Sequence, residues 1–276
     1  MTSDRRGRRG RRTAAAGVCL LFALGLGAAA APLLAGVDPY APDLAARLAP
    51  PRPGHVLGQD ALGRDVLARV LYGARISLVV STVTVGLSLT LGVALGALAG
   101  YRGGWFDEAL ARVIDVLLAF PGILLAIAVA AVLGPSLRNV VLALTLLGWT
   151  GYARLARTEV AALRRRDFVR AAEALGAGPA HILLRHLLAL AAPALLVQAT
   201  FGMAGVIVAE ASLSFLGLGA PSPLPSWGAM IDEGRPFLLV APHLTLAPGT
   251  ALALTVLGLQ LLGDGLRDLL DVRERT

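Results

Sequence analysis

Six stretches without a charged residue recur along this chain of 276 residues, and they constrain its fold more than any other feature. Crossing the hydrocarbon core of a bilayer, about 30 Å thick, takes about 20 mostly apolar residues in a helix. Five stretches are that long, and the fourth, with 15 residues, can still cross if the arginines at its two ends reach toward the headgroups. The six stretches are Thr13–Val37, Ile76–Tyr101, Val116–Leu137, Asn139–Ala153, Leu187–Ala209 and Leu244–Gly263.

The composition supports the same fold class. Charged residues make up 16% of the chain, whereas soluble domains carry about 25%. We therefore predict an all-α integral membrane protein with six transmembrane helices. The N-terminal segment has some features of a secretory signal, since six arginines precede an apolar stretch that ends in "AAAAP". Its uncharged part runs for 25 residues, however, which is long enough to span a bilayer. An uncleaved first helix is the prediction, and cleavage is the alternative.

The basic residues predict the orientation of the chain. All 25 are arginine. If the N-terminus is cytoplasmic, the segments on that side hold 18 arginines and those on the outer side hold seven. Because arginine and lysine accumulate in cytoplasmic loops, this distribution predicts that both termini are inside. The absence of lysine also excludes a standard phosphate-binding P-loop, which needs one.

Two sizeable segments are expected on the outer side. The first ends in "LGQDALGRDVLARVLYGAR", which predicts an amphipathic helix whose role is either to lie on the membrane or to take part in gating. Arg64, Asp65 and Arg69 are expected to point away from its apolar face. That face consists of Val66, Leu67, Val70 and Leu71. The second segment, "LGLGAPSPLPSWGAMIDEGRPF", suits a compact loop, with Trp227 as an anchor at the membrane interface.

Residues 164–178, "RRRDFVRAAEALGAG", predict a short helix on the cytoplasmic side. Asp167 is expected to cap it by accepting hydrogen bonds from backbone N–H groups. Gly176 is expected to end it, and Pro179 suits the first turn of the next helix. The expected apolar face has helical spacing and consists of Phe168, Ala171, Ala172 and Leu175.

A helix of two turns is marginal alone in water, so this one is expected to pack against its own bundle or in a groove of a partner protein. Three alternatives remain open: an amphipathic helix lying on the membrane, a loop without a specific role, and a helix-turn-helix that binds DNA. Nucleic-acid binding is disfavoured, because the second helix of such a motif would continue into the apolar stretch Leu187–Ala209.

The region from about His55 to Val272 resembles the inner-membrane permease subunits of bacterial dipeptide, oligopeptide and nickel ABC importers. The resemblance is collinear and is carried by "GQDALGRD", "GWTGYARLARTEV", "FVRAAEALGAG", "AEASLSFLGLGAPSPLPSWGAMIDEG" and "LLGDGLRDLLD". It implies a type I ABC-importer transmembrane domain in the bacterial inner membrane. The expected division is a basic cytoplasmic N-terminus (1–13), a first transmembrane helix (14–37), a periplasmic segment (38–74), the ABC transmembrane type-1 domain (75–264, with a coupling loop at about 156–186) and a cytoplasmic tail (265–276).

The resemblance also implies that the 164–178 helix is a coupling helix, which docks on an ATPase subunit. The residues assigned to this role are Asp167, Phe168, Arg170, Ala171, Ala172, Leu175 and Gly176. Arg170 replaces the glutamate of the family's "EAA" motif, so a salt bridge through that glutamate is not expected here. The implied partners are a second homologous permease chain, two ATP-binding subunits, an extracytoplasmic solute-binding protein and the lipid bilayer. No cofactor is expected in this chain, since ATP and Mg²⁺ would be held by the ATPase subunits.

Three polar residues in the fifth predicted helix or at its outer end, Gln198, Glu210 and Ser212, are assigned to the translocation path or its gate. A carboxylate at the bilayer centre is costly, so Glu210 is expected either to face the path or to be wetted at the outer surface. The sequence offers no catalytic constellation and no metal site: its four histidines are scattered, and His181 and His186 are five residues apart, unlike the HExxH pair. This absence argues against an enzyme, and the resemblance implies that the chain imports di- or oligopeptides. A self-contained secondary transporter and a membrane-embedded enzyme are the alternatives.

Overall fold

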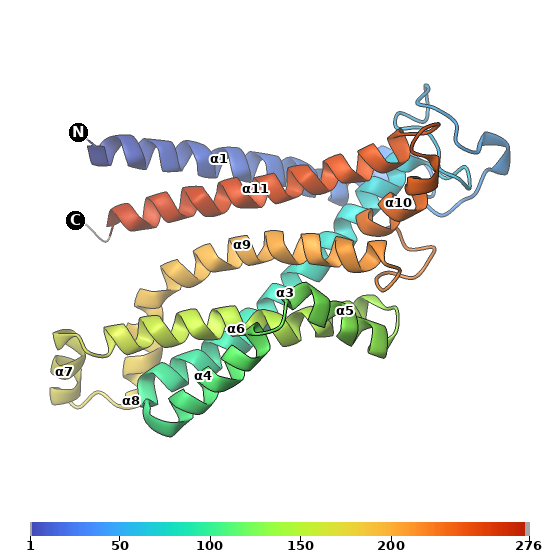
Figure 1. Ribbon diagram of the computed structural model, residues 1–276. Helices are drawn as coiled ribbons and strands as arrows, with labels where there is room; N and C mark the ends of the chain where they lie inside the picture. The colour runs from blue at the N-terminus through green and yellow to red at the C-terminus, as the bar shows by residue number, and fades with distance from the viewer. Residues whose placement is uncertain (1, 274–276) are drawn as a thin grey trace.

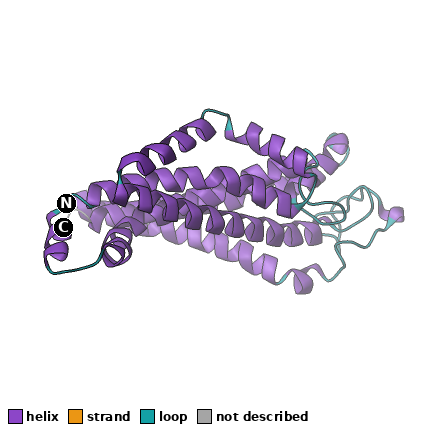
Figure 2. Ribbon diagram, turned by 90° about the horizontal axis from the view of Figure 1, so that it is seen from below, coloured by secondary structure: helices purple, strands orange, loops and turns teal. Residues whose placement is uncertain are grey.

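The computed structural model describes residues 2–273, and these residues form helices and loops without a strand (Figures 1 and 2). Both termini lie at one end of the bundle together with α7 and α8, and we call this the terminal end. The opposite end, which we call the loop end, holds the long segment before α3 and the short helix α10. The helices are α1 (Thr2–Ala29), α2 (Ala31–Ala35), η1 (Leu44–Ala46), α3 (Val66–Arg102), α4 (Gly104–Leu118), α5 (Gly122–Leu133), α6 (Leu137–Leu163), α7 (Asp167–Ala174), α8 (Pro179–His181), η2 (Ile182–Leu187), α9 (Leu188–Phe215), α10 (Trp227–Gly234), η3 (Arg235–Phe237) and α11 (His243–Arg273).

Glycines let α3 and α6 approach each other closely, and this is the most extensive helix pair of the bundle. Gly92, Gly96 and Gly100 recur every four residues on α3, so they share one face of the helix. A Cβ atom at any of them would collide with the backbone of α6, near Trp149, Ala153 and Arg157 respectively. Small residues at such spacing are typical of helix pairs in membranes, where close van der Waals packing drives association.

Helix α1 begins at Thr2, so it includes most of the segment 1–13 that was predicted to precede the first transmembrane helix. Its apolar part is Gly10–Ala29. It packs along α11 (Figure 1). The helix ends at Ala29 rather than continuing to Val37, because Pro32 cannot donate the next backbone hydrogen bond. Arg75 of α3 supplies donors for the carbonyls that this end leaves free. Its Nε donates to the oxygen of Ala28 at 2.5 Å, and an Nη donates to that of Ala29 at 2.8 Å.

The third predicted helix is wrong as a single straight span. The segment Val116–Leu137 contains the end of α4, a break at Ala119–Pro121 and the whole of α5, and the two helices meet at an angle of 84°. Pro121 explains the break, since it lacks an N–H and restricts the residue before it. With 12 residues, α5 is about 18 Å long, which is too short to cross a bilayer by itself.

Among residues 2–273, four helices are long and apolar enough to cross a membrane, and the bent α4–α5 pair makes five if it is counted as one span. The four are Gly10–Ala29, Val66–Arg102, Pro179–Phe215 and His243–Leu270. The fourth predicted stretch lies inside α6, a helix of 27 residues whose uncharged part is limited to the 15 residues between Arg138 and Arg154. The structure is thus an all-helical membrane domain with four to five candidate spans.

Candidate functional sites

The short helix α7 lies at the terminal end, where one side chain holds it to the bundle. Val169 is 1% exposed and packs in a cluster with apolar residues of α3, α6 and η2. Ala172, one turn later, is half-buried against the same cluster. Val169 was not among the residues predicted for this site, because a valine among apolar neighbours gives no signal that distinguishes an anchor from a docking residue.

The four residues predicted to form the apolar face of α7 do not all lie on the same side of the helix. Phe168 is 39% exposed and Leu175 is 89% exposed, and Ala171 is exposed beside them. Ala172 instead faces the bundle with Val169. Residues three, four and seven apart share a helical face, so Phe168, Ala171 and Leu175 form an apolar surface that is exposed at each of the three positions, most fully at Leu175. We call these three residues the outer face of α7.

The prediction for the first end of α7 is wrong, and the prediction for its last end is confirmed. Asp167 is wrong as the capping residue: it is the first residue of the helix, Arg166 precedes it as the cap, and no side chain accepts a capping hydrogen bond. Its carboxylate still lies near the positive end of the helix dipole. The other end is as predicted. Gly176 has φ of +84°, its N–H donates to Glu173 at 2.9 Å, and the N–H of Ala177 donates to Ala172 at 3.0 Å. This is the Schellman arrangement, which glycine favours.

Arg170, the residue that departs from the family motif, is exposed on α7. Its Nη1 lies 4.0 Å from Oδ1 of Asp167, and both side chains are in solvent. Exposed pairs at this distance contribute little to stability. The guanidinium of Arg170 is therefore available to a partner rather than committed within the chain.

A cavity of about 300 Å³ opens between α5, α6 and α9, with Ser88 of α3 in its wall. Gln198 lines this cavity, together with Gly202 and Gly205 of the same helix. Tyr152 and Gly148 of α6 face them from the other side. No charged residue contributes to the lining. The cavity is thus neutral and mostly apolar, with a few polar groups in its wall.

The other two residues assigned to the path lie elsewhere. Glu210 is fully buried, so it neither lines this cavity nor is wetted by the outer surface. It accepts hydrogen bonds from the hydroxyls of Ser214, at 2.7 Å, and of Ser77 on α3, at 3.3 Å. The hydrogen bond between Glu210 and Ser77 therefore links α9 to α3 within the bundle. Ser212 donates to the carbonyl of Val208 in its own helix at 2.8 Å, a bond that serves the helix and not the cavity.

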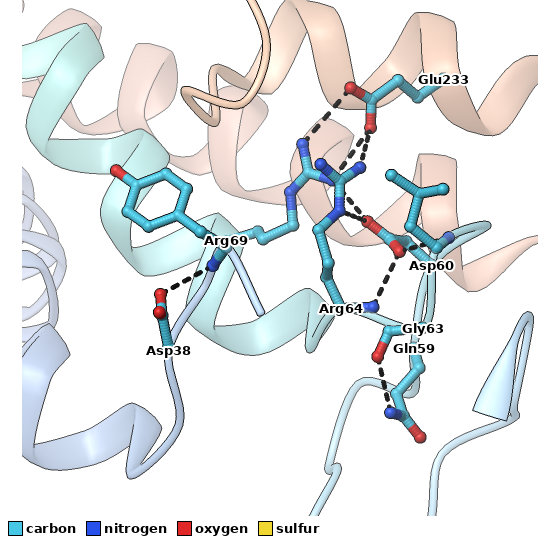
Figure 3. A network of polar contacts seen from close by, with 9 residues as sticks. Asp38, Gln59, Asp60, Gly63, Arg64, Arg69 and Glu233 are labelled. Atoms are coloured by element: carbon cyan, nitrogen blue, oxygen red, sulfur yellow. Dashed lines mark hydrogen bonds and ion pairs between the residues drawn. The ribbon is translucent and has the colours of Figure 1, made fainter. Parts of the chain in front are cut away.

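The loop end contains a cluster of charged side chains that the sequence analysis missed (Figure 3). Arg64 and Arg69 are 4% and 1% exposed, although they were expected to lie on the polar side of an amphipathic helix, away from its apolar face. Both guanidinium groups bind Asp60 and Glu233: Arg64 donates to Asp60 at 2.7 Å and to Glu233 at 2.9 Å, and Arg69 contacts the same two acids. The cluster joins the segment before α3 to α10. We call these four residues the loop-end cluster.

Asp60 is held in its ionised form by this cluster. Burial alone would raise the pKa of its carboxyl group. The backbone N–H of Arg64, the charges of Arg69 and Arg64, and the backbone N–H of Leu62 together outweigh burial, and they lower the pKa below its ordinary value. The pairing of two arginines with two acids explains why charges can be buried here, since a buried charge needs a partner.

Two further expectations about the loop end are corrected. Residues from Val66 onward do not form a separate amphipathic helix, because α3 begins at Val66 and continues without interruption to Arg102. Asp65 caps that helix by accepting from the N–H of Ala68 at 2.7 Å. Trp227 is 1% exposed rather than an interfacial anchor, and its Nε1 donates to the carbonyl of Val70 at 3.0 Å. Helix α10 is thus fixed against the first turn and a half of α3.

Comparison with known proteins identifies the family. Residues 92–276 match the model of the binding-protein-dependent transport system inner membrane component. The dipeptide transport system permease protein DppC of Alkalihalophilus pseudofirmus is 41% identical over 265 residues, which are 96% of this chain and 87% of that protein. The glutathione transport system permease protein GsiD of Pectobacterium atrosepticum is 45% identical over 221 residues, 80% of this chain and 73% of that protein.

A third relative gives a similar result. GsiD of Escherichia coli O157:H7 is 47% identical over 217 residues, which are 79% of this chain and 72% of that protein. The helical architecture, the candidate spans and these matches agree with the resemblance drawn from the sequence motifs. The chain therefore belongs to the family of binding-protein-dependent transport system inner membrane components, and it is a permease subunit of such an importer.

Proposed function

We propose that this chain is one of two related permease subunits of an ATP-driven importer for di- or oligopeptides in the bacterial inner membrane. The observation that carries the proposal is α7, a short helix anchored by buried Val169 that leaves an apolar outer face uncovered. Such a face fits a groove on a partner protein. The names of the relatives, which refer to a dipeptide and to the tripeptide glutathione, support peptides as the substrate class.

In this proposal the chain crosses the membrane six times, with the bent α4–α5 pair as the third crossing and α6 as the fourth. The terminal end faces the cytoplasm. Two observations support this orientation: both termini and α7 lie at the same end of the bundle (Figure 1), and the segments assigned to the cytoplasm hold 18 of the 25 arginines. The loop end then faces the periplasm, where an extracytoplasmic binding protein would deliver the peptide.

The outer face of α7 is proposed to dock on an ATPase subunit, and ATP and Mg²⁺ are held by two such subunits rather than by this chain. When the ATPase subunits close on ATP, α7 moves with them and the bundle turns from inward- to outward-facing. The exposed guanidinium of Arg170 is available for an acidic residue of the groove, in place of the salt bridge that a glutamate would make. Gly176 and Pro179 separate α7 from the helix that follows, so that α7 is a compact unit.

Leu175→Asp tests the docking. Leu175 is 89% exposed, so a charge there leaves the packing of this chain intact but places an unpaired carboxylate in an apolar interface. We expect loss of both ATPase copurification and ATP-dependent peptide uptake in proteoliposomes. Ala180→Asp is the matched control, because it adds the same charge at an exposed position of α8, outside the outer face. Normal assembly and uptake with Leu175→Asp would refute the docking assignment.

The two alternatives from other classes of protein are separated from the importer by reconstitution. A self-contained secondary transporter would take up peptide in proteoliposomes that contain this chain without an ATPase. A membrane-embedded enzyme would convert a substrate in detergent with no partner present. We expect neither activity, and uptake only when both permease chains, the ATPase subunits, the binding protein and ATP are supplied.

A further inference from the structure

The cavity between α5, α6 and α9 contains hydroxyl groups that have no partner in the chain. Tyr152 is 4% exposed and Ser88 is 2% exposed, and neither hydroxyl has a hydrogen-bond partner among the described residues. Both residues line the cavity. The tyrosine hydroxyl lies against Gly202 of α9, where a Cβ atom would collide with it. Since a buried polar group without a partner is costly, these hydroxyls point to a ligand or to water that satisfies them.

The lining sets the chemistry that such a ligand must have. The wall has no charged side chain, so an ionised group placed there would lose its hydration without an opposite charge to replace it. Tyr152 and Ser88 can each donate and accept one hydrogen bond or more, and the amide of Gln198 can do both as well. A peptide group, with one N–H and one C=O, matches this set. The rest of the wall is apolar or glycine.

The size and opening of the cavity suit a part of a peptide rather than a whole one. Its volume of about 300 Å³ is at the lower end of small-molecule sites. Gly205 and Gly122 are exposed at its edge, so it is open along the face of α5 and α9. A side chain together with the peptide group next to it can therefore enter the cavity while the peptide termini stay outside.

We propose that this cavity is a subsite of the translocation path that takes one uncharged side chain of the transported peptide, with Tyr152, Ser88 and Gln198 binding the adjacent peptide group. The proposal rests on the proposed function, since it assumes a peptide as cargo. It assigns to this chain a selectivity for the size of an apolar side chain, and it leaves the charged termini of the peptide to be bound elsewhere.

Gly205→Leu tests the subsite by filling it. A Cβ atom at Gly205 meets nothing within 4 Å, so the substitution does not disturb the helix packing. The matched control is Gly86→Leu on α3, where a Cβ is equally free but the residue does not line the cavity. In proteoliposomes with the whole complex, we expect Gly205→Leu to slow uptake of Leu-Leu several-fold more than uptake of Ala-Ala. Gly86→Leu is expected to leave both rates unchanged.

Tyr152→Phe removes the hydroxyl alone and keeps the ring. We expect the KM for Leu-Leu to rise roughly two- to tenfold, as the loss of one hydrogen bond requires, with kcat unchanged. A third measurement covers the case in which the leucine variant does not assemble. With Cys19→Ala as background, Gly205→Cys is expected to react with a water-soluble thiol reagent, and Leu-Leu is expected to slow that reaction.

The outcomes separate the subsite from the function on which it rests. If the wild-type complex takes up neither peptide with ATP, the proposed function fails and the subsite fails with it. If the wild-type complex transports both peptides but Gly205→Leu affects them equally, or behaves like Gly86→Leu, the subsite is overturned and the proposed function stands. A cysteine at position 205 that the water-soluble reagent cannot reach would show a lipid-filled groove and would also overturn the subsite.

Discussion

Replacing Asp60 with asparagine removes one of the two acids that hold Arg64 and Arg69 at the loop end. Removing one partner of a fully buried ion pair costs about 3–5 kcal/mol, because a charge is left uncompensated. Glu233 remains in contact with both arginines and is 39% exposed, so water and the second acid offset part of this cost. We expect Asp60→Asn to lower the free energy of unfolding by about 2–3 kcal/mol, below the range for a fully buried pair.

The assay is denaturation of the purified protein in detergent, followed by circular dichroism, with Asp115→Asn as the control. Asp115 pairs with Arg154 at 2.9 Å, but the two side chains are 70% and 53% exposed, so its loss is expected to cost about 0–1 kcal/mol. Adding Arg69→Met to Asp60→Asn is expected to restore part of the stability, since it removes the uncompensated cation. Equal effects of Asp60→Asn and Asp115→Asn would refute the reasoning.

The pH dependence of the same measurement follows from the lowered pKa of Asp60. A carboxyl group whose pKa is lower in the folded state stabilises the fold fully above its unfolded pKa, here the ordinary value of 3.8. That contribution is lost only as the pH falls below this value toward the folded pKa. The difference between wild type and Asp60→Asn is therefore expected to be constant from about pH 5 to pH 8. A difference that vanishes by pH 6 would contradict this assignment.

Three further substitutions have expected outcomes. Gly96→Val forces a side chain into the backbone of Ala153 and is expected to abolish accumulation of folded protein in the membrane, whereas Gly86→Val, with no atom near its Cβ, is not. Gly176→Ala requires a positive φ of an alanine, which costs about 1–2 kcal/mol, and a modest loss of ATPase copurification is expected; an unchanged yield would contradict it. Trp227→Phe removes the hydrogen bond to Val70 and is expected to cost about 1 kcal/mol in the denaturation assay.

The sequence predicted the elements whose signals are local. The apolar stretches located the candidate spans, and Gly176 and Pro179 located the end of α7 and the start of α8, because backbone conformation there depends on the residue itself. The family was also correctly predicted, since its motifs are collinear over most of the chain. The break at Pro121 was missed, because hydropathy over a window of 20 residues does not register a single proline in an apolar segment.

Positions that depend on contacts between distant segments could not be predicted. Arg64 and Arg69 have the pattern of a solvated face, and one of the two acids that pair with them, Glu233, comes from α10, more than 150 residues later. Trp227 looked like an interfacial residue for the same reason. Within α7, Val169 is buried because of the angle at which the helix packs against α3 and α6. That angle cannot be predicted from the sequence of an eight-residue helix.

The length of α3 has a mechanical consequence for the whole chain. At 37 residues it is about 55 Å long, and it contains no proline at which it could hinge. Its first turn is held among the loop-end cluster and Trp227, and its last turns pack in the same cluster as Val169 of α7. The rod thus joins the two surfaces of the bundle directly. We therefore expect α3 to carry a displacement of α7 to the opposite face, and in that case reciprocity requires that a protein bound at that face changes the affinity of α7 for its own partner.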